Sequence, residues 1–336
     1  MPEITPTYRI WMLRLILPFK FGKPITGLLI FLVLWAVLGF VSENVNSTIE
    51  VSIYLKLFLI ATCSYIVPVF AHIIDRTLVA FDEVAPMLDA TSEEISMWRR
   101  QFTHQSARWT FVVTASALVL WLCHICLLEW SYGRNILDIF ASNQYATSLG
   151  AALVWVTLMT ANSSLILNAR LLATLGQRLK LDLLRGSSHV TLAKVAVMST
   201  LSIIGAQALF VLLVIDSDSN WVAFTPGFAI TTVPMLALFF IPVWPMHQRL
   251  RSTKREELDA IDRQLAALRP EPNIDFSATD KLDQLNPLLL YRREIRQVSE
   301  WPFDVSALAR LVLYLILPPL TWVGAALIEN MVDALV

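Results

Sequence analysis

Seven long apolar runs, separated by polar segments, dominate the chain. Each run is about 18 to 25 residues long, the length that an α-helix needs to cross the hydrocarbon core of a bilayer. Lipid offers the backbone no hydrogen-bond partners, so runs of this length are expected to be helices. The pattern predicts an all-α, polytopic membrane protein with seven transmembrane helices. The predicted spans are 24–41, 51–73, 109–129, 147–169, 193–215, 222–246 and 305–328.

The polar segments alternate between short and long. The short ones, such as 42–50 and 216–221, are too small to fold alone. The longest is 247–303, in which apolar residues recur at 3-4-3 spacing in two stretches on either side of Pro270 and Pro272. Such spacing places these residues on one face of each helix, so the segment is expected to form a hairpin of two amphipathic helices. The first seam is Leu258, Ile261, Leu265 and Leu268, and the second is Leu288, Tyr291, Ile295 and Val298.

Narrow apolar seams of this kind require partners. The two seams can pair with each other, with a helix predicted for 91–103, or with copies from other subunits. Thr91 and Glu94 stand at capping-box spacing at the start of that helix. The residues expected to make oligomer or partner contacts are Leu258, Ile261, Leu265, Leu268, Ile295 and Val298.

The two ends of the chain complete the predicted organisation. Residues 7–19 mix aromatic, aliphatic and basic side chains, which is typical of an interfacial helix. We therefore divide the chain into four parts. They are an N-terminal interfacial part (1–23), six spans (24–246), a hairpin (247–303), and a last span with a tail (304–336).

The distribution of charge predicts the orientation. All but two of the 26 lysines and arginines lie in the first, third, fifth and seventh polar segments or at their borders with the spans, Lys56 and Arg134 being the exceptions. Because basic residues accumulate on the cytoplasmic side, the N-terminus and the hairpin are expected in the cytosol and the C-terminus outside. The basic inner surface suits an anionic leaflet or a cytosolic protein as partner. On the acidic outer surface, Glu43, Asp216 and Asp218 are candidates for attracting cations.

The composition supports a membrane protein, and the sequence contains few candidates for catalytic or metal-binding residues. Hydrophobic residues make up 56% of the chain, and the mean hydropathy is +0.60. Cys123, His124 and Cys126 would need further ligands to hold zinc, and pairing His124 with His72 around haem is a remote alternative. We find no nucleotide-binding glycine pattern and no catalytic set. The sequence therefore predicts no enzyme activity, no metal, no cofactor and no nucleic-acid partner.

Uncharged polar residues in the fourth and fifth runs allow two interpretations. They can hydrogen-bond between helices, which is the usual role of such residues, or they can line a water-filled path. We favour packing. The residues are Asn162, Ser163, Ser164 and Asn168 in the fourth run, and Ser199, Thr200, Ser202 and Gln207 in the fifth.

The last run carries a semi-polar stripe. Residues at 3-4-4-3-4 spacing from Ala307 share one helical face, and Pro318 and Pro319 predict a kink in it. The stripe can be a small-residue packing face or the lining of a conduit. The candidate pore-lining residues are Arg310, Tyr314, Pro318, Thr321, Ala325 and Glu329.

Two resemblances follow from these features. The Trp301-Pro302-Phe303-Asp304 stretch and the segment from Phe81 to Arg100 resemble an uncharacterised family of prokaryotic multi-pass membrane proteins, which implies the inner membrane. The topology is similar to that of the insect odorant and gustatory receptors, which are seven-span ligand-gated cation channels. That resemblance implies a homotetramer with a central pore lined by the last span and cytosolic helices that anchor assembly. The Thr-Tyr and Gln signature of these receptors is not matched by Thr321-Trp322 and Glu329.

Three functions remain open on this basis. The leading hypothesis is an oligomeric, cation-permeable channel with Tyr314, Thr321 and Glu329 near its pore. The alternative is a membrane receptor or scaffold whose hairpin binds a partner. A small-molecule transporter is the third.

Overall fold

Six of the seven predicted spans are helices in the computed structural model. It describes residues 7–44, 52–133, 145–179, 187–214, 221–268 and 279–301, together with Ala309, Leu313, Ile316, Leu320 and Gly324. Six helices are long and apolar enough to cross a membrane, so the protein is an all-α, multi-pass membrane protein. The predicted span 305–328 lies outside the described residues apart from those five positions. The six helices are α2 (Gly22–Asn44), α3 (Ile53–Val84), α5 (Ala107–Ser131), α7 (Tyr145–Gln177), α8 (Ser187–Ala208) and α10 (Trp221–Ala267).

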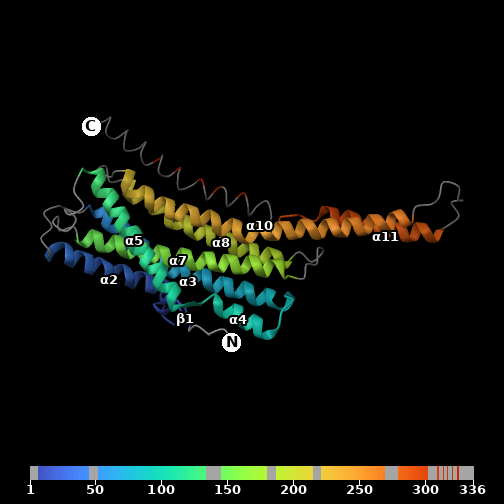
Figure 1. The fold of residues 1–336 in the computed structure, drawn as a ribbon, viewed down its shortest axis with the longest axis horizontal. Helices are drawn as coiled ribbons and strands as arrows, with labels where there is room; N and C mark the ends of the chain where they lie inside the picture. The colour runs from blue at the N-terminus through green and yellow to red at the C-terminus, as the bar shows by residue number, and fades with distance from the viewer. Residues whose placement is uncertain are drawn as a thin grey trace.

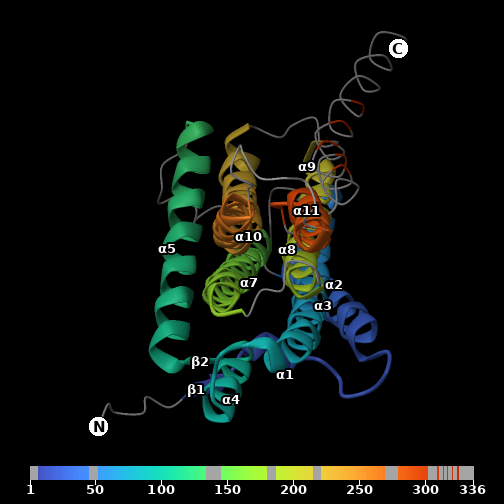
Figure 2. The same cartoon turned by 90° about the vertical axis from the view of Figure 1, so that its right-hand side faces the viewer.

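The helices α3 and α7 form the centre of the bundle. The helix α2 packs against α3, α5 packs against α7, and α8 and α10 cover the remaining side (Figures 1 and 2). Phe58, Phe70, Leu158 and Met235 are among the buried side chains where these helices meet. A four-residue helix, α9 (Val211–Val214), follows α8 and lies beside α3.

The helices α2 and α5 leave most of their apolar side chains uncovered. Phe111 and Trp130 on α5 and Leu28 and Phe40 on α2 are exposed. Hydrocarbon tails are as apolar as these side chains, so a bilayer covers them without cost. Little of either helix is buried by the protein, whereas α3 and α7 are more than half buried. The bundle is therefore built around α3 and α7, with α2 and α5 at its lipid-facing edges.

The N-terminal segment differs from the predicted helix over 7–19. Thr7–Arg9 forms a strand, β1, paired antiparallel with β2 (His104–Ser106), and the helix that follows, α1, covers only Trp11–Arg14. The backbone N–H of Ile10 donates to the carbonyl of Thr103 at 3.0 Å, which continues the pairing. The prediction was wrong because the strand's hydrogen-bond partner lies about a hundred residues away, where a local pattern cannot reveal it.

The predicted capping box is confirmed at the start of α4 (Ser92–Gln101). The backbone N–H of Glu94 donates to Thr91 Oγ1 at 3.3 Å, and that of Thr91 donates to a Glu94 carboxylate oxygen at 2.9 Å. A short 3₁₀ helix, η1 (Ala85–Met87), joins α3 to this region. Trp98 of α4 and the following Phe102 are buried against the ends of α3 and α7. The loop between the second and third spans is thus a folded layer on one end of the bundle.

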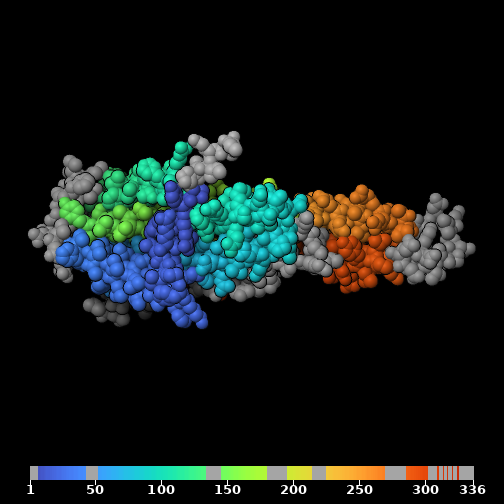
Figure 3. Space-filling view, turned by 90° about the horizontal axis from the view of Figure 1, so that it is seen from below, coloured from blue at the N-terminus to red at the C-terminus, as the bar shows by residue number. Residues whose placement is uncertain are grey.

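The predicted helical hairpin is also confirmed. The helix α10 runs for 47 residues, about 70 Å at 1.5 Å per residue, out of the bundle and along the hairpin. The returning helix is α11 (Thr279–Gln297), and the hairpin stands out from the body in orange and red (Figure 3). Ile261 and Ile295 are buried between the two helices, so the seams pair with each other within one chain. Leu258, Leu265, Tyr291 and Val298 pack around them.

Candidate functional site

An asparagine on α7 satisfies a carbonyl that a proline leaves free on α10. Pro234 has no N–H to donate to the carbonyl of Ile230, four residues earlier in the helix. The side-chain nitrogen of Asn162 donates to that carbonyl at 3.0 Å. Asn162 is buried, so an unpaired amide or carbonyl here would carry a large desolvation penalty. Pro234 and Asn162 therefore act as a pair across two helices.

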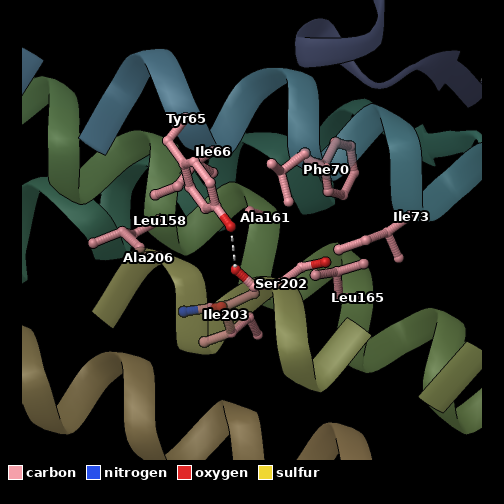
Figure 4. A pocket seen from close by; sticks show the side chains of 12 residues that line it. Tyr65, Ile66, Phe70, Ile73, Leu158, Ala161, Leu165, Ser202, Ile203 and Ala206 are labelled. Atoms are coloured by element: carbon pink, nitrogen blue, oxygen red, sulfur yellow. Dashed lines mark hydrogen bonds between the residues drawn. The ribbon is translucent and has the colours of Figure 1, made fainter. Parts of the chain in front are cut away.

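A tyrosine joins α3 to α8 next to this pair. The hydroxyl of Tyr65 donates to the backbone carbonyl of Ser202 at 3.1 Å (Figure 4). A Cβ added at Gly205 would overlap the Tyr65 hydroxyl, so the glycine makes room for the contact. A helical carbonyl has a second lone pair, and the Tyr65 hydroxyl can use it without breaking the α8 helix.

The side chains around this junction enclose a small cavity. Tyr65, Asn162 and Ser202 line it together with apolar residues such as Phe70 and Leu158 (Figure 4). Its volume is about 30 Å³, which is the space that one water molecule occupies in the liquid. The arrangement suits a polar contact between helices and is too small for an organic substrate.

A second polar contact joins α8 and α10. The side-chain nitrogen of Gln207 donates to Thr232 Oγ1 at 2.8 Å, and Thr231 Oγ1 lies 3.5 Å from the same nitrogen. By contrast, the hydroxyls of Ser199, Thr200 and Ser202 donate to carbonyls four residues earlier in their own helix. Gln207 therefore bonds between helices, as the first of the two sequence interpretations expects, whereas the three hydroxyls find their acceptors within α8.

Polar residues of α7 also hold the N-terminal segment and β2. Thr160, Ser164 and Asn168 recur at intervals of four, and so share one face of α7. Trp11 Nε1 donates to Thr160 Oγ1 at 3.3 Å. The side-chain amide of Gln105 donates to Ser164 Oγ at 2.7 Å. Residues that the sequence placed in one span thus connect three separate parts of the chain.

The base of the hairpin is held by α10. His247 Nδ1 donates to the carbonyl of Glu300 at 2.9 Å, and the ring stacks on Trp301 with centroids 4.1 Å apart. Lys254 Nζ donates to the carbonyl of Val298 at 2.8 Å and lies 3.8 Å from the Glu300 carboxylate. Carbonyls at a helix C-terminus lack partners within the helix, and these side chains supply donors at the end of α11. We call these five residues the hairpin base; three of them, Val298, Glu300 and Trp301, lie shortly before the last predicted span.

The described residues include none of the six candidate pore residues. Arg310, Tyr314, Pro318, Thr321, Ala325 and Glu329 lie outside the described residues, as do Asp216 and Asp218. Glu43 belongs to the last turn of α2, but its side chain is outside the described part. The described positions Leu313, Ile316 and Leu320 of the last predicted span are exposed. The predicted partner contacts, from Leu258 to Val298, lie within the hairpin, where Ile261 and Ile295 are buried.

The histidine and cysteines of the third span are not arranged as ligands. His124 Nδ1 accepts a hydrogen bond from Trp155 Nε1 at 3.2 Å, which joins α5 to α7. Cys123 is exposed on the lipid-facing side of α5. Among the described residues, no group of three or more His, Cys, Asp or Glu side chains could hold a metal ion.

The sequence reading missed the contacts of Tyr65 and Gly205, and the pairing of Asn162 with Pro234. A proline inside an apolar run does signal a free carbonyl four residues earlier, here Ile230. That signal predicts that a donor is needed but does not say which helix supplies it. No family model, curated protein or solved structure matches the chain. The resemblance to odorant and gustatory receptors therefore stays a prediction.

Proposed function

We propose that the protein is a membrane receptor or scaffold that binds a partner through its hairpin. The observation that carries the proposal is a pair of adjacent leucines on α11, which we call the leucine patch. Leu289 is 50% exposed and Leu290 is 62% exposed, although the hairpin already has a core of its own. On an arm rich in charged residues, exposed leucines indicate a contact surface. Arg293, one turn further along, is also exposed, so an acidic partner fits.

The orientation that we propose places this arm in the cytosol of a prokaryotic cell, with seven spans in the inner membrane. In the described part, Arg76 lies in the second half of α3, Arg99 in α4, Arg108 in the first turn of α5 and Arg178 directly after α7. The end of α3, the helix α4 and the end of α7 lie on the side of the bundle from which the hairpin extends (Figure 1). Cations gathered on one side are the signature of the cytoplasmic face.

The hairpin base supports a role in transmission. It joins the end of α11 to α10 at the point where α10 leaves the bundle. Trp301, which stacks on His247, lies four residues before the start of the last predicted span. A partner that moves the hairpin would therefore act on that span through a short connection.

A photo-crosslinking amino acid tests the leucine patch in intact cells. Placed at position 290, it is expected to form an adduct with one partner protein. Placed at position 263, where Arg263 is exposed on α10, it serves as the control and is expected to form none. Loss of the adduct in Leu289→Ser supports the leucine patch. A self-adduct would assign the patch to a homo-oligomer, and no adduct from position 290 would refute the proposal.

The second candidate function is a cation-permeable channel, a homotetramer with the last span at its pore. It is supported by the semi-polar stripe and by Leu313, Ile316 and Leu320, which the rest of the chain leaves uncovered. The cavity of about 30 Å³ inside the bundle is too small to be an ion path through one subunit. An ion path formed between subunits is therefore favoured. Currents across planar bilayers, lost in Thr321→Trp and altered in Glu329→Lys, are the expected result. Bilayers that stay silent under varied voltage, pH and ligands would remove this candidate.

A further inference from the structure

A groove lies between the start of α5 and the side of α7. Its volume is about 340 Å³, within the ~300–1,000 Å³ typical of small-molecule sites. On the α5 side the lining changes along the chain from the polar residues Gln101, His104 and Ser106, which form the polar end, to Trp109, where α5 enters its apolar run. On the α7 side, Asn168 stands between Leu167 and Leu171. Trp109 and Leu167 mark the apolar end.

The walls of this α5–α7 groove are held in place by hydrogen bonds. Ser106 caps α5, its hydroxyl accepting from the backbone N–H of Trp109 at 3.2 Å. Gln105 donates to Ser164 of α7, and the His104 ring lies 2.8 Å from the hydroxyl of Thr103. Because β2 also pairs with β1, the polar end is fixed from two sides. The polar end of the groove is therefore held in place by the fold.

Three exposed arginines stand next in sequence to lining residues of the groove. Arg100 precedes Gln101, Arg108 precedes Trp109, and Arg170 precedes Leu171. In the described part of the chain these three arginines form no ion pair. Other cations at this end of the bundle do, namely Arg99 with Asp82, Arg178 with Glu94, and Lys23 with Asp75. The first turn of α5 contains no acidic residue, and the positive end of its helix dipole adds to the field.

We propose that the α5–α7 groove binds one phospholipid with an anionic headgroup. The phosphate lies at the polar end near Ser106 and His104, and the acyl chains run from Leu171 past Leu167 and Trp109 towards the bilayer. The tryptophan stands at the boundary between the polar loop and the apolar run, where such rings favour the headgroup region. A soluble phosphate would leave the apolar end uncovered, and a zwitterionic lipid would leave the positive charge uncompensated. This site is separate from the hairpin and does not depend on the proposed function.

Native mass spectrometry of the purified full chain tests the proposal. We expect one molecule of phosphatidylglycerol to be retained in preference to phosphatidylcholine. The variant Arg108→Gln/Arg170→Gln should weaken retention by about fivefold per arginine. Leu167→Trp, which fills the apolar end, should abolish it. The control Arg255→Gln/Arg263→Gln, on the hairpin, should retain the lipid like the wild type, because both arginines are exposed far from the groove.

Two further arms separate the outcomes. Arg108→Lys/Arg170→Lys keeps the charge, so retained binding shows that the glutamine variant acts through charge and not through misfolding. Inorganic phosphate at millimolar concentration is expected not to displace the lipid. Equal retention of the two lipids, displacement by phosphate, or retention unchanged in the glutamine variant would each overturn the proposal.

Discussion

The hydroxyl of Tyr65 in α3 lies directly over Gly205 in α8, and donates to the carbonyl of Ser202 in the same turn at 3.1 Å. The contact combines a hydrogen bond with a close approach of ring and backbone that only glycine permits. It ties the central helix α3 to α8 within the span. Each half of this contact can be removed separately, which makes its contribution to stability measurable.

Gly205→Ala is expected to destabilise the bundle by about 1–3 kcal/mol, because the new methyl group overlaps the Tyr65 hydroxyl. Tyr65→Phe alone should cost about 0.6 kcal/mol, the typical value for such bonds in membranes. In the double variant, the hydroxyl oxygen that would collide with the new methyl group is absent. The double variant should therefore lose less stability than the sum of the losses in the two single variants. Denaturant titration in detergent measures all three. Strict additivity would show that the two residues do not interact.

Asn162→Ala should destabilise the protein by about 1–3 kcal/mol, because the Ile230 carbonyl is left buried without a donor. Pro234→Ala restores the backbone N–H that this carbonyl lacks. Asn162→Ala should therefore cost less in the Pro234→Ala background than in the wild type. The matched control is Pro242→Ala, which lies in the same helix but restores an N–H to a different carbonyl, that of Leu238, and should leave the cost of Asn162→Ala unchanged. Thermal unfolding followed by circular dichroism gives the comparison.

Lys254→Met should loosen the hairpin base without unfolding the hairpin. The Lys254 side chain is only 13% exposed and donates to the Val298 carbonyl, and such charge-assisted bonds contribute about 1.5–3 kcal/mol. We expect faster hydrogen exchange at residues 295–301 and unchanged exchange around Ile261. Arg263→Met, on an exposed position of the same helix, is the control. Unchanged exchange at 295–301 in Lys254→Met would show that the ammonium group does not hold the end of α11.

The capping box predicts a pH dependence for α4. The Thr91 backbone N–H lowers the pKa of the Glu94 carboxyl, and Arg178, 3.4 Å away, lowers it further. Since the pKa is lower in the folded than in the unfolded state, the stabilisation is complete above the unfolded value of about 4.3 and is lost as the pH falls through the folded value.

Hydrogen exchange of α4 between about pH 6 and about pH 3, corrected for intrinsic rates, should therefore show less protection at the acid end. Glu94→Gln keeps a capping box but has no charge to lose, so its protection should not change with pH in this way. Glu93→Gln, in the same turn but outside the box, should behave like the wild type. An identical acid response in Glu94→Gln would assign the effect to another group.

Patterns that depend on local spacing were readable from the sequence. Six apolar runs became six helices, the Thr91–Glu94 pair became a capping box, and the seams around Ile261 and Ile295 became a hairpin core. In each case the residues that interact are close in sequence or share one helical face. The helix expected at 7–19 failed because its first residues pair with β2, far along the chain.

By itself, the sequence determined that this is a helical membrane protein with a charged hairpin, because the length of an apolar run and the spacing of a seam are properties of one helix. The tertiary structure alone decided that Asn162 serves the carbonyl freed by Pro234, that Tyr65 lies on Gly205, and that the α5–α7 groove exists. A proline or an asparagine in a span indicates that its helix needs a hydrogen-bond partner from another element. Which helix provides the partner depends on how the helices pack, and no local pattern contains that information.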